Sequence, residues 1–189
     1  MAGKKTCEVI ANFIIERKYK RFAELGVAEG KLLHSILEDE KVCDILEIYY
    51  AIDLWKDYHD VSSEKWEQYY QEIRSLDRDN LQLIVLRQDV TVASNCFVDG
   101  SLDMVFIDAD HSYEAVKNDI CTWLPKICRG GLLLGHDYNY KEVRKAVDEI
   151  FDSIGITCAV PTWAFEVAWG YFYKIKDTNL REKMIGGKW

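Results

Sequence analysis

The chain has 189 residues, of which 49% are hydrophobic and 13% aromatic, with only two prolines. Such a chain can bury enough apolar surface to fold, which excludes a disordered tail and favours a single domain over residues 1–189. Its 24 basic and 32 acidic residues give a net charge of −8, and no basic stripe is long enough to neutralise a nucleic-acid backbone. We therefore expect no nucleic-acid partner.

The cysteines and the apolar runs indicate where the protein resides. No Cys-x-x-Cys pair occurs among the six cysteines, and the chain opens without a charged and then apolar signal segment. No apolar run approaches the ~20 residues needed to cross a bilayer. These features predict a soluble, cytoplasmic protein with reduced thiols and no membrane partner.

The first part of the chain predicts a helix, then a strand, a tight turn and a second helix. Apolar residues at helical spacing indicate a helix from about residue 5 to 19, within an N-terminal segment of residues 1–20. The apolar run 22–27 predicts a short strand broken by glycine, and residues 31–37 predict the helix after it.

The same unit of a strand followed by a helix recurs through residues 21–152, which we expect to form the core. The further predicted strands are 48–53, 83–86, 104–107 and 132–134, and the further helices are 62–75, 112–127 and 141–151.

The last part, residues 153–189, predicts a pair of strands at 154–160 and 169–175 that run antiparallel. Apolar strands that alternate with helices imply a parallel sheet covered on both faces. We therefore predict an α/β fold, Rossmann-like and doubly wound. Its mostly parallel, seven-stranded sheet has a last antiparallel strand and helices on both faces.

Polar residues follow five successive predicted strands, and in an open parallel sheet the ligand lies at these carboxyl ends. They are Glu24 with the turn 26–30, Asp53, Gln88 with Asp89, the segment 108–111, and His136 with Asp137. Five strand ends with acidic residues are more than the fold alone requires. This indicates a binding site along this edge of the sheet.

Two of these strand ends indicate an adenosine ligand. The turn 24–30 has glycine at positions 26 and 30, which lets the backbone approach a ligand closely, although a plain turn uses the same glycines. Asp53 stands where a carboxylate accepts hydrogen bonds from both ribose hydroxyls. Its alternative role is that of a helix N-cap or a surface acid.

An acidic residue that binds the ribose is compatible with both NAD and S-adenosylmethionine. The turn after the first strand distinguishes the two cofactors. A dinucleotide needs its pyrophosphate on a helix N-terminus, usually through Gly-x-Gly-x-x-Gly. Here Val27 replaces the middle glycine, and Glu24 and Glu29 bring negative charge to that place. A cationic sulfonium ligand with an amino group suits this turn better than a diphosphate.

An ordered set of motifs over about residues 20 to 152 resembles one enzyme family. Residues 24–30 (ELGVAEG) are similar to its first-strand motif, Glu-x-Gly-x-x-x-Gly, and residues 102–113 (LDMVFIDADHSY) to its fourth-strand motif. Residues 123–126 (WLPK), followed by Gly130-Gly131 and His136-Asp137-Tyr138, continue the likeness. The chain resembles class I S-adenosylmethionine-dependent methyltransferases, within the methyltransferase 24 group of catechol, caffeoyl-coenzyme A and macrocin-type O-methyltransferases.

The resemblance implies S-adenosylmethionine as the cofactor and a small-molecule hydroxyl, of a sugar or a phenol, as the acceptor. The residues that it assigns to the cofactor are Glu24, Gly26 and Gly30 at the methionine end, Asp53 at the ribose, Gln88 and Asp89 at the adenine, and in addition Val27, Leu54 and Asp108. Trp55 packs near the base in this interpretation, or else is an ordinary half-buried aromatic residue.

Metal-dependent members of the family hold a divalent ion with the acid that matches Asp108 and with a pair after the fifth strand. Here that pair is His136-Asp137, where relatives show Asp-Asn or Asp-Asp. The resemblance implies Mg²⁺ or another divalent metal at Asp108, His136 and Asp137, although a histidine ligand favours a softer ion or leaves the site incomplete. His111 matches the catalytic base, and Asp110 is the alternative base.

We predict an S-adenosylmethionine-dependent methyltransferase that methylates a hydroxyl group. One alternative is a cofactor-binding protein that has lost catalysis, which the departure at His136 keeps open, and another is a nicotinamide-dependent dehydrogenase. The aromatic segment 161–169 is expected to join the last two strands as a pocket wall, a dimer contact or core. A homodimer stays open.

Overall fold

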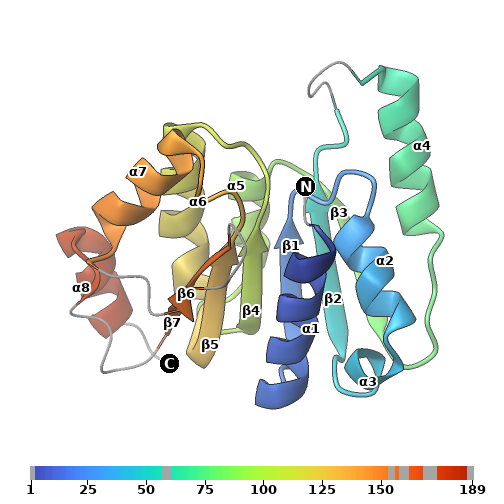
Figure 1. Ribbon diagram of the computed structural model, residues 1–189, viewed down its shortest axis with the longest axis horizontal. Helices are drawn as coiled ribbons and strands as arrows, with labels where there is room; N and C mark the ends of the chain where they lie inside the picture. Colours follow the sequence, from blue (N-terminus) through green and yellow to red (C-terminus); the bar gives the residue numbers. More distant parts are fainter. Residues whose placement is uncertain (1–2, 57–60, 153–155, 158–161, 168–173, 187–189) are drawn as a thin grey trace.

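The computed structural model of the protein describes residues 3–56, 61–152, 156–157, 162–167 and 174–186. One β-sheet runs through this part of the chain, with helices on both of its faces (Figure 1). No helix within these ranges is both long and apolar enough to cross a lipid bilayer.

The sheet is mostly parallel. Its strands are β1 (Arg21–Leu25), β2 (Ile48–Asp53), β3 (Gln82–Arg87), β4 (Leu102–Ile107), β5 (Ile127–Gly135), β6 (Ile156–Thr157) and β7 (Trp163–Glu166). They lie in the order β3-β2-β1-β4-β5-β7-β6, and β7 is antiparallel to both of its neighbours. After β3 the chain returns to the other side of β1 as β4. In open α/β sheets ligands bind at the carboxyl ends of the strands beside such a reversal, here β1 and β4. We use the word crevice for this edge of the sheet, formed by the carboxyl ends of β1 to β5.

Two groups of helices cover opposite faces of the sheet. The helices are α1 (Lys4–Arg17), α2 (Lys31–Glu38), α3 (Glu40–Cys43), α4 (Ser63–Arg74), α5 (Val90–Ala93), α6 (Tyr113–Trp123), α7 (Lys141–Ile150) and α8 (Thr178–Gly186). One buried cluster takes its helical side chains from α1 to α4, and a second takes them from α5 to α8. The sheet therefore has a core on each side.

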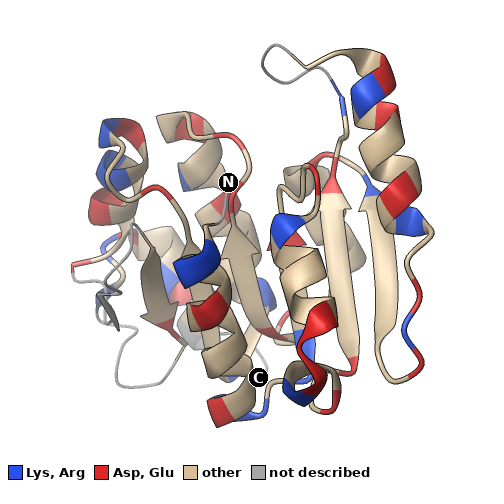
Figure 2. Cartoon of the chain, turned by 45° about the vertical axis from the view of Figure 1, so that its right-hand side comes forward, with Lys and Arg blue, Asp and Glu red and all other residues tan. Residues whose placement is uncertain are grey.

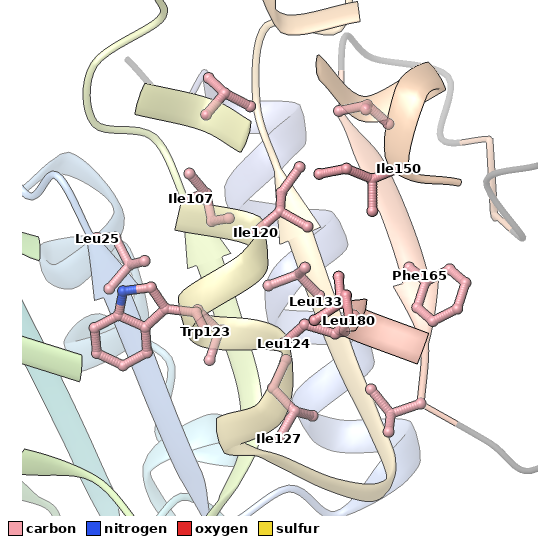
Figure 3. Close-up of a cluster of buried hydrophobic side chains, with 14 of the residues drawn as sticks. Leu25, Ile107, Ile120, Trp123, Leu124, Ile127, Leu133, Ile150, Phe165 and Leu180 are labelled. Atoms are coloured by element: carbon pink, nitrogen blue, oxygen red, sulfur yellow. The ribbon is translucent and has the colours of Figure 1, made fainter. Parts of the chain in front are cut away.

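Alternation along the strands supplies both cores. In β1, Phe22 points into the first cluster, while Ala23 and Leu25 point into the second. Figure 3 shows the second cluster, in which Trp123 of α6 lies beside Leu25 of β1. Full burial of one large apolar side chain stabilises the fold by about 1.5–3 kcal/mol, so these contacts fix the positions of the strand ends.

Charged residues of both signs are interspersed over the helices (Figure 2). The basic run at the end of α1 and the start of β1 is largely paired with acids. Its ion pairs are Arg17–Glu166 at 3.1 Å, Lys20–Glu47 at 3.4 Å and Arg21–Asp103 at 3.5 Å. This run is therefore neutralised locally.

The predicted α/β, Rossmann-like fold with a mostly parallel sheet is confirmed. Helix α6 ends at Trp123, four residues before the predicted end, and a 3-10 turn over Leu124–Lys126 follows it. Pro125 in this turn has no N–H group with which to continue the α-helical hydrogen bonds. Strand β5 begins at Ile127, which is five residues earlier than predicted.

The prediction for the C-terminal segment is wrong in part. Strand β7 lies within residues 161–169, which the sequence analysis assigns to a loop. Trp163 and Phe165 face one core and Ala164 faces the other, so the alternation of a strand is present in the sequence. The predicted strand 169–175 lies mostly outside the described residues, and Ile175 forms a single bridge with Phe151. Helix α8 also occupies this segment, which the sequence pattern does not predict.

Candidate active site

The turn after β1 lies directly against the end of β4 because of Gly26. Its φ is +87°, and a Cβ atom at this position would lie 2.3 Å from the backbone oxygen of Asp108. The Gly26 N–H also donates to the Ile52 carbonyl of β2, at 2.9 Å. Only glycine allows this approach, so the predicted glycine turn joins three strand ends.

Asp53 ties the same turn to the end of β2. Its Oδ2 accepts from the Ala28 N–H at 2.9 Å, and its Oδ1 accepts from the Trp55 N–H at 2.7 Å. The Trp55 indole N–H donates back to the Ala28 carbonyl at 2.9 Å. Because a carboxylate has about four acceptor positions, both oxygens of Asp53 can still receive a ligand hydroxyl.

Trp55 is fully buried rather than half-buried. Its side chain is 1% exposed, and its ring lies 5.3 Å from that of Tyr70 in α4. Both Trp55 and Ala28 have positive φ values, of 44° and 50°, which are strained for residues with side chains. The hydrogen bonds through Asp53 stabilise this conformation.

Glu24 is buried below the crevice. Its side chain is 3% exposed and hydrogen-bonds the hydroxyl of Tyr49 on β2. Burial raises the pKa of Glu24 well above its ordinary value, and the charges of Asp108 and Asp53 add to this effect. The sequence does not predict its contact with Tyr49, because the contact runs diagonally across two neighbouring strands: the register pairs Glu24 with Ala51, two residues further along β2.

The other residues predicted for the cofactor lie around the same crevice. Gly30, with φ of +82°, starts α2, and Val27 is buried. Leu54 and Gln88 are exposed after β2 and β3. Asp89 is exposed too, and its carboxylate caps α5 by accepting from the Val92 N–H at 3.0 Å.

A second group of residues, which we call the acid–histidine cluster, comprises Asp108, His111, His136 and Asp137. The His111 Nε2 lies 2.8 Å from Asp137 Oδ2 and 3.4 Å from Asp108 Oδ1. The His136 Nδ1 lies 3.1 Å from the same Asp137 oxygen and 3.9 Å from the same Asp108 oxygen. Two carboxylate oxygens therefore lie within 4 Å of two imidazole nitrogens.

The cluster is well shielded from water. The side chains of Asp108, His136 and Asp137 are 4%, 8% and 11% exposed, and that of His111 is 26% exposed. The hydrogen bond with Asp108, together with the charges of Asp108 and Asp137, raises the pKa of His111 above its ordinary value. Tyr140 lies at the rim, with its ring 5.7 Å from the His111 ring.

Within the described residues, Asp108, His111 and Asp137 are the group with the geometry of a metal site, because one ligand atom of each lies within 4.8 Å of the others. The sequence prediction names His136 in place of His111. The spacing Asp108-x-x-His111 is a signal in the sequence for the contact between these two side chains. The resemblance assigns His111 to the role of catalytic base instead.

Asp110, the alternative base, is exposed. Its Oδ1 accepts from the Ser112 N–H at 2.7 Å and so supports the start of α6. The structure brings Asp108, His111, His136 and Asp137 together and leaves Asp110 outside their contacts. The catalytic roles of His111 and Asp110 stay predictions.

Residues 23–138, more than half of the chain, match the model of a family described as a methyltransferase domain. The chain belongs to this methyltransferase family. The resemblance that the motifs indicate is thereby confirmed, and the matched stretch contains the glycine turn, Asp53 and the whole acid–histidine cluster.

Two solved methyltransferase structures share the fold. The O-methyltransferase NovP is 18% identical with a TM-score of 0.62, over 88% of this chain and 81% of that one. The Podospora anserina methyltransferase PaMTH1, solved with S-adenosylhomocysteine, is 14% identical with a TM-score of 0.58, over 88% and 80% of the two chains.

One curated relative matches at the level of sequence. The uncharacterized protein y4gI of Sinorhizobium fredii is 26% identical over 125 residues, which are 65% of this chain. The match covers only 14% of y4gI, so this methyltransferase spans a small part of that relative's length.

Proposed function

We propose that this methyltransferase uses S-adenosylmethionine to methylate a hydroxyl group of a small molecule, a sugar or a phenol, with help from a divalent ion. The observation that carries the proposal is the contact of Gly26 with the backbone of Asp108. This contact places the turn suited to a cofactor directly beside the cluster suited to an acceptor. The two reactants can therefore bind next to each other.

The cofactor half of the crevice is built around Asp53. Its two oxygens have acceptor positions left for the two ribose hydroxyls. Exposed Leu54, Gln88 and Asp89 would border the adenine, and the turn at Gly26 would border the methionine end. The family itself uses S-adenosylmethionine, which supports the same assignment.

Fewer acidic residues support the preference for a sulfonium over a diphosphate than the sequence indicates. Glu29 pairs with Lys31 at 2.8 Å, and burial, which raises the pKa of Glu24, disfavours the charged form of that carboxyl. Both effects reduce the negative charge that the turn presents to a ligand. Asp53 and Asp108 remain as the acids that face the crevice, and they would attract a positively charged donor.

The reaction is a single displacement. The acceptor oxygen attacks the sulfonium methyl carbon in line, the new O–C bond forms as the C–S bond breaks, and S-adenosylhomocysteine leaves as a neutral thioether. The acceptor hydroxyl gives up its proton in the same process. A divalent ion at the acid–histidine cluster would make that hydroxyl more acidic.

The residues of the chain supply position and a proton acceptor. Asp108 and Asp137 are nearly buried, so their negative charge acts in surroundings that screen it weakly. Asp110 is exposed at the start of α6, where it can exchange a proton with water. His111 has two candidate roles, as base or as metal ligand.

The first test is calorimetric titration of the protein with S-adenosylhomocysteine. Asp53→Asn should weaken binding by roughly tenfold or more, because it removes the charge that accepts the ribose hydroxyls. The matched control is Asp79→Asn, an exposed acid on the loop before β3, at the opposite end of the sheet, which should leave binding unchanged. Equal affinities in all three proteins, or no binding at all, would overturn the proposal.

The second test is production of S-adenosylhomocysteine with catechols and methyl glycosides in the presence of Mg²⁺, Mn²⁺ or Zn²⁺. A protein that binds the cofactor but turns over no acceptor would favour the binding-protein alternative, which the histidine at position 136 keeps open. Binding of NADH without binding of S-adenosylhomocysteine would favour the dehydrogenase.

A further inference from the structure

The Nδ1 atom of His136 is a buried polar atom without a hydrogen-bond partner among the described residues. It lies 3.1 Å from Asp137 Oδ2, a distance at which a hydrogen bond would be expected, but the directions of the two groups do not make one. Buried polar atoms are almost always satisfied in folded proteins, so this one indicates a missing partner.

A cation is one partner that fits both groups. A bare imidazole nitrogen carries a lone pair, and so does the carboxylate oxygen that faces it, and two lone pairs at this distance repel each other. A proton on Nδ1 would relieve the repulsion only along the nitrogen–oxygen line, which the geometry does not provide. A cation placed between the groups would bind both lone pairs at once.

The position of His111 also supports a cation in the cluster. Its Nε2 approaches the two carboxylate oxygens that His136 approaches, at 2.8 Å and 3.4 Å. Ligand atoms on an ion with bonds of about 2.1 Å lie about 3.0–3.4 Å apart in octahedral or tetrahedral sites. Two of the four contacts of the cluster, at 3.1 and 3.4 Å, fall in this range, and the other two, at 2.8 and 3.9 Å, lie on either side of it. Asp108, His111 and Asp137 already have ligand atoms within 4.8 Å of one another, and His136 would complete the site by a small movement toward them.

We propose that His111 and His136 both act as nitrogen ligands, with Asp108 and Asp137, in a site that selects a transition metal such as Mn²⁺, Fe²⁺ or Zn²⁺ over Mg²⁺. Mg²⁺ prefers oxygen ligands and retains much of its water, whereas imidazole suits transition metals. His111 is then a ligand and not the free base. The catalytic part of this inference rests on the proposed function, but metal binding is measured without the cofactor.

The test uses Mn²⁺ and Mg²⁺ as probes, because Mn²⁺ binds oxygen and nitrogen ligands and avoids the free thiols of the chain. Calorimetry should show Mn²⁺ binding roughly 100-fold or more tightly than Mg²⁺. Almost any site favours Mn²⁺ to some degree, so the decisive variant is His136→Asp, which restores the oxygen ligand that relatives have. It should reduce the affinity ratio at least about tenfold.

Matched variants locate the effect. His111→Asn should weaken Mn²⁺ binding roughly 10- to 100-fold, whereas His34→Asn, on α2 beside Glu72 and outside the cluster, should leave it unchanged. An affinity ratio that is the same in the wild type, His111→Asn and His136→Asp would overturn the inference. So would a wild-type protein that prefers Mg²⁺.

A measurement on the wild type avoids variants that fail to fold. The chain has four histidines, and nitrogen NMR of their rings reports metal ligation directly. Addition of Zn²⁺ should shift His111 and His136 and leave His34 in place, and shifts at neither of the first two would overturn the inference. If the metal binds as described but S-adenosylhomocysteine does not, the proposed function fails and this inference stands.

Discussion

The two halves of the crevice are built in different ways. The half formed by the ends of β1 and β2 is held by backbone groups: Asp53 receives two backbone N–H groups, and Gly26 lies against neighbouring backbone. The half formed by the ends of β4 and β5 consists of charged side chains in contact, and one of them, His136, lacks a hydrogen bond among the described residues.

This difference separates fold from chemistry. Groups that are fully bonded within the protein are ordered before any ligand arrives, which reduces the cost of binding. A buried polar atom without a partner, such as Nδ1 of His136, depends on a ligand to satisfy it. Changes to the backbone-held groups of the first half should therefore affect both stability and cofactor affinity, while changes in the second half should affect metal binding and activity.

The largest expected effect is on activity and comes from the second half. Asp108→Asn should lower kcat by roughly 10³-fold, because it removes a nearly buried negative charge from the cluster that positions and deprotonates the acceptor. The affinity for S-adenosylhomocysteine should change less than about threefold. Steady-state rates and calorimetry measure the two quantities.

Asp99→Asn is the control for this prediction, because Asp99 is exposed and pairs with Lys126 before the start of β4 and β5, at the end of these strands opposite the cluster. It should leave kcat unchanged. If Asp108→Asn instead abolished cofactor binding and spared the rate, Asp108 would belong to the cofactor half, and the comparison drawn above would be wrong.

The next largest effect is expected where the two halves touch, at the contact of Gly26 with Asp108. Gly26→Ala would place a Cβ atom 2.3 Å from the Asp108 backbone oxygen, and neither backbone can move without shifting a strand. We expect a loss of about 3 kcal/mol in the free energy of unfolding and weaker cofactor binding. Urea unfolding and calorimetry measure both.

Gly130→Ala separates strain from collision in this prediction. Gly130 also has a positive φ, of +85°, but a Cβ atom there would have nothing within 4 Å. It should cost only about 1 kcal/mol. Equal losses in the two variants would show that backbone strain, rather than the contact with Asp108, makes Gly26 necessary.

A third effect concerns Asp119 of α6, which contacts α5. Its side chain is buried, it contacts Thr91 at 3.3 Å, and its Oδ2 has no hydrogen-bond partner in the described part of the chain. Burial, with a smaller contribution from the charges of Asp89 and Asp110, raises the pKa of Asp119 to about 7.

The sign of the pH dependence follows from that shift. The folded protein holds this proton more tightly than the unfolded chain, so stability decreases as the pH rises from about 4 to about 7 and is constant above. Asp119→Asn should remove this slope and stabilise the protein at pH 8 by about 2 kcal/mol, half of what a shift of this size gives without relaxation. Thermal unfolding at pH 5 and pH 8 measures the difference. An unchanged slope in the variant would mean that Asp119 is already ionised at low pH.

The first half could be predicted from the sequence more completely than the second. Gly26, Gly30 and Asp53 are positions where one residue type meets a backbone requirement, so the local pattern identifies them. The alternation of side chains in β7 is an equally local pattern, but the predicted strand lies at residues 169–175, further along the chain. The contacts of His111 and Glu24 depend on which strands become neighbours, which a pattern along one chain does not encode.

The smallest effect tests Glu24, whose carboxyl group hydrogen-bonds Tyr49 beneath the crevice. Because burial raises the pKa of Glu24, it is the charged form that the site disfavours, and Glu24→Gln replaces it with a neutral group of the same shape. We expect stability to change by less than about 1 kcal/mol and cofactor affinity by less than about threefold. Tyr49→Phe, which leaves the buried carboxyl without this partner, should cost about 2 kcal/mol instead. A tenfold loss of affinity in Glu24→Gln would show that its charge acts on the cofactor, and would move Glu24 from the scaffold to the binding surface.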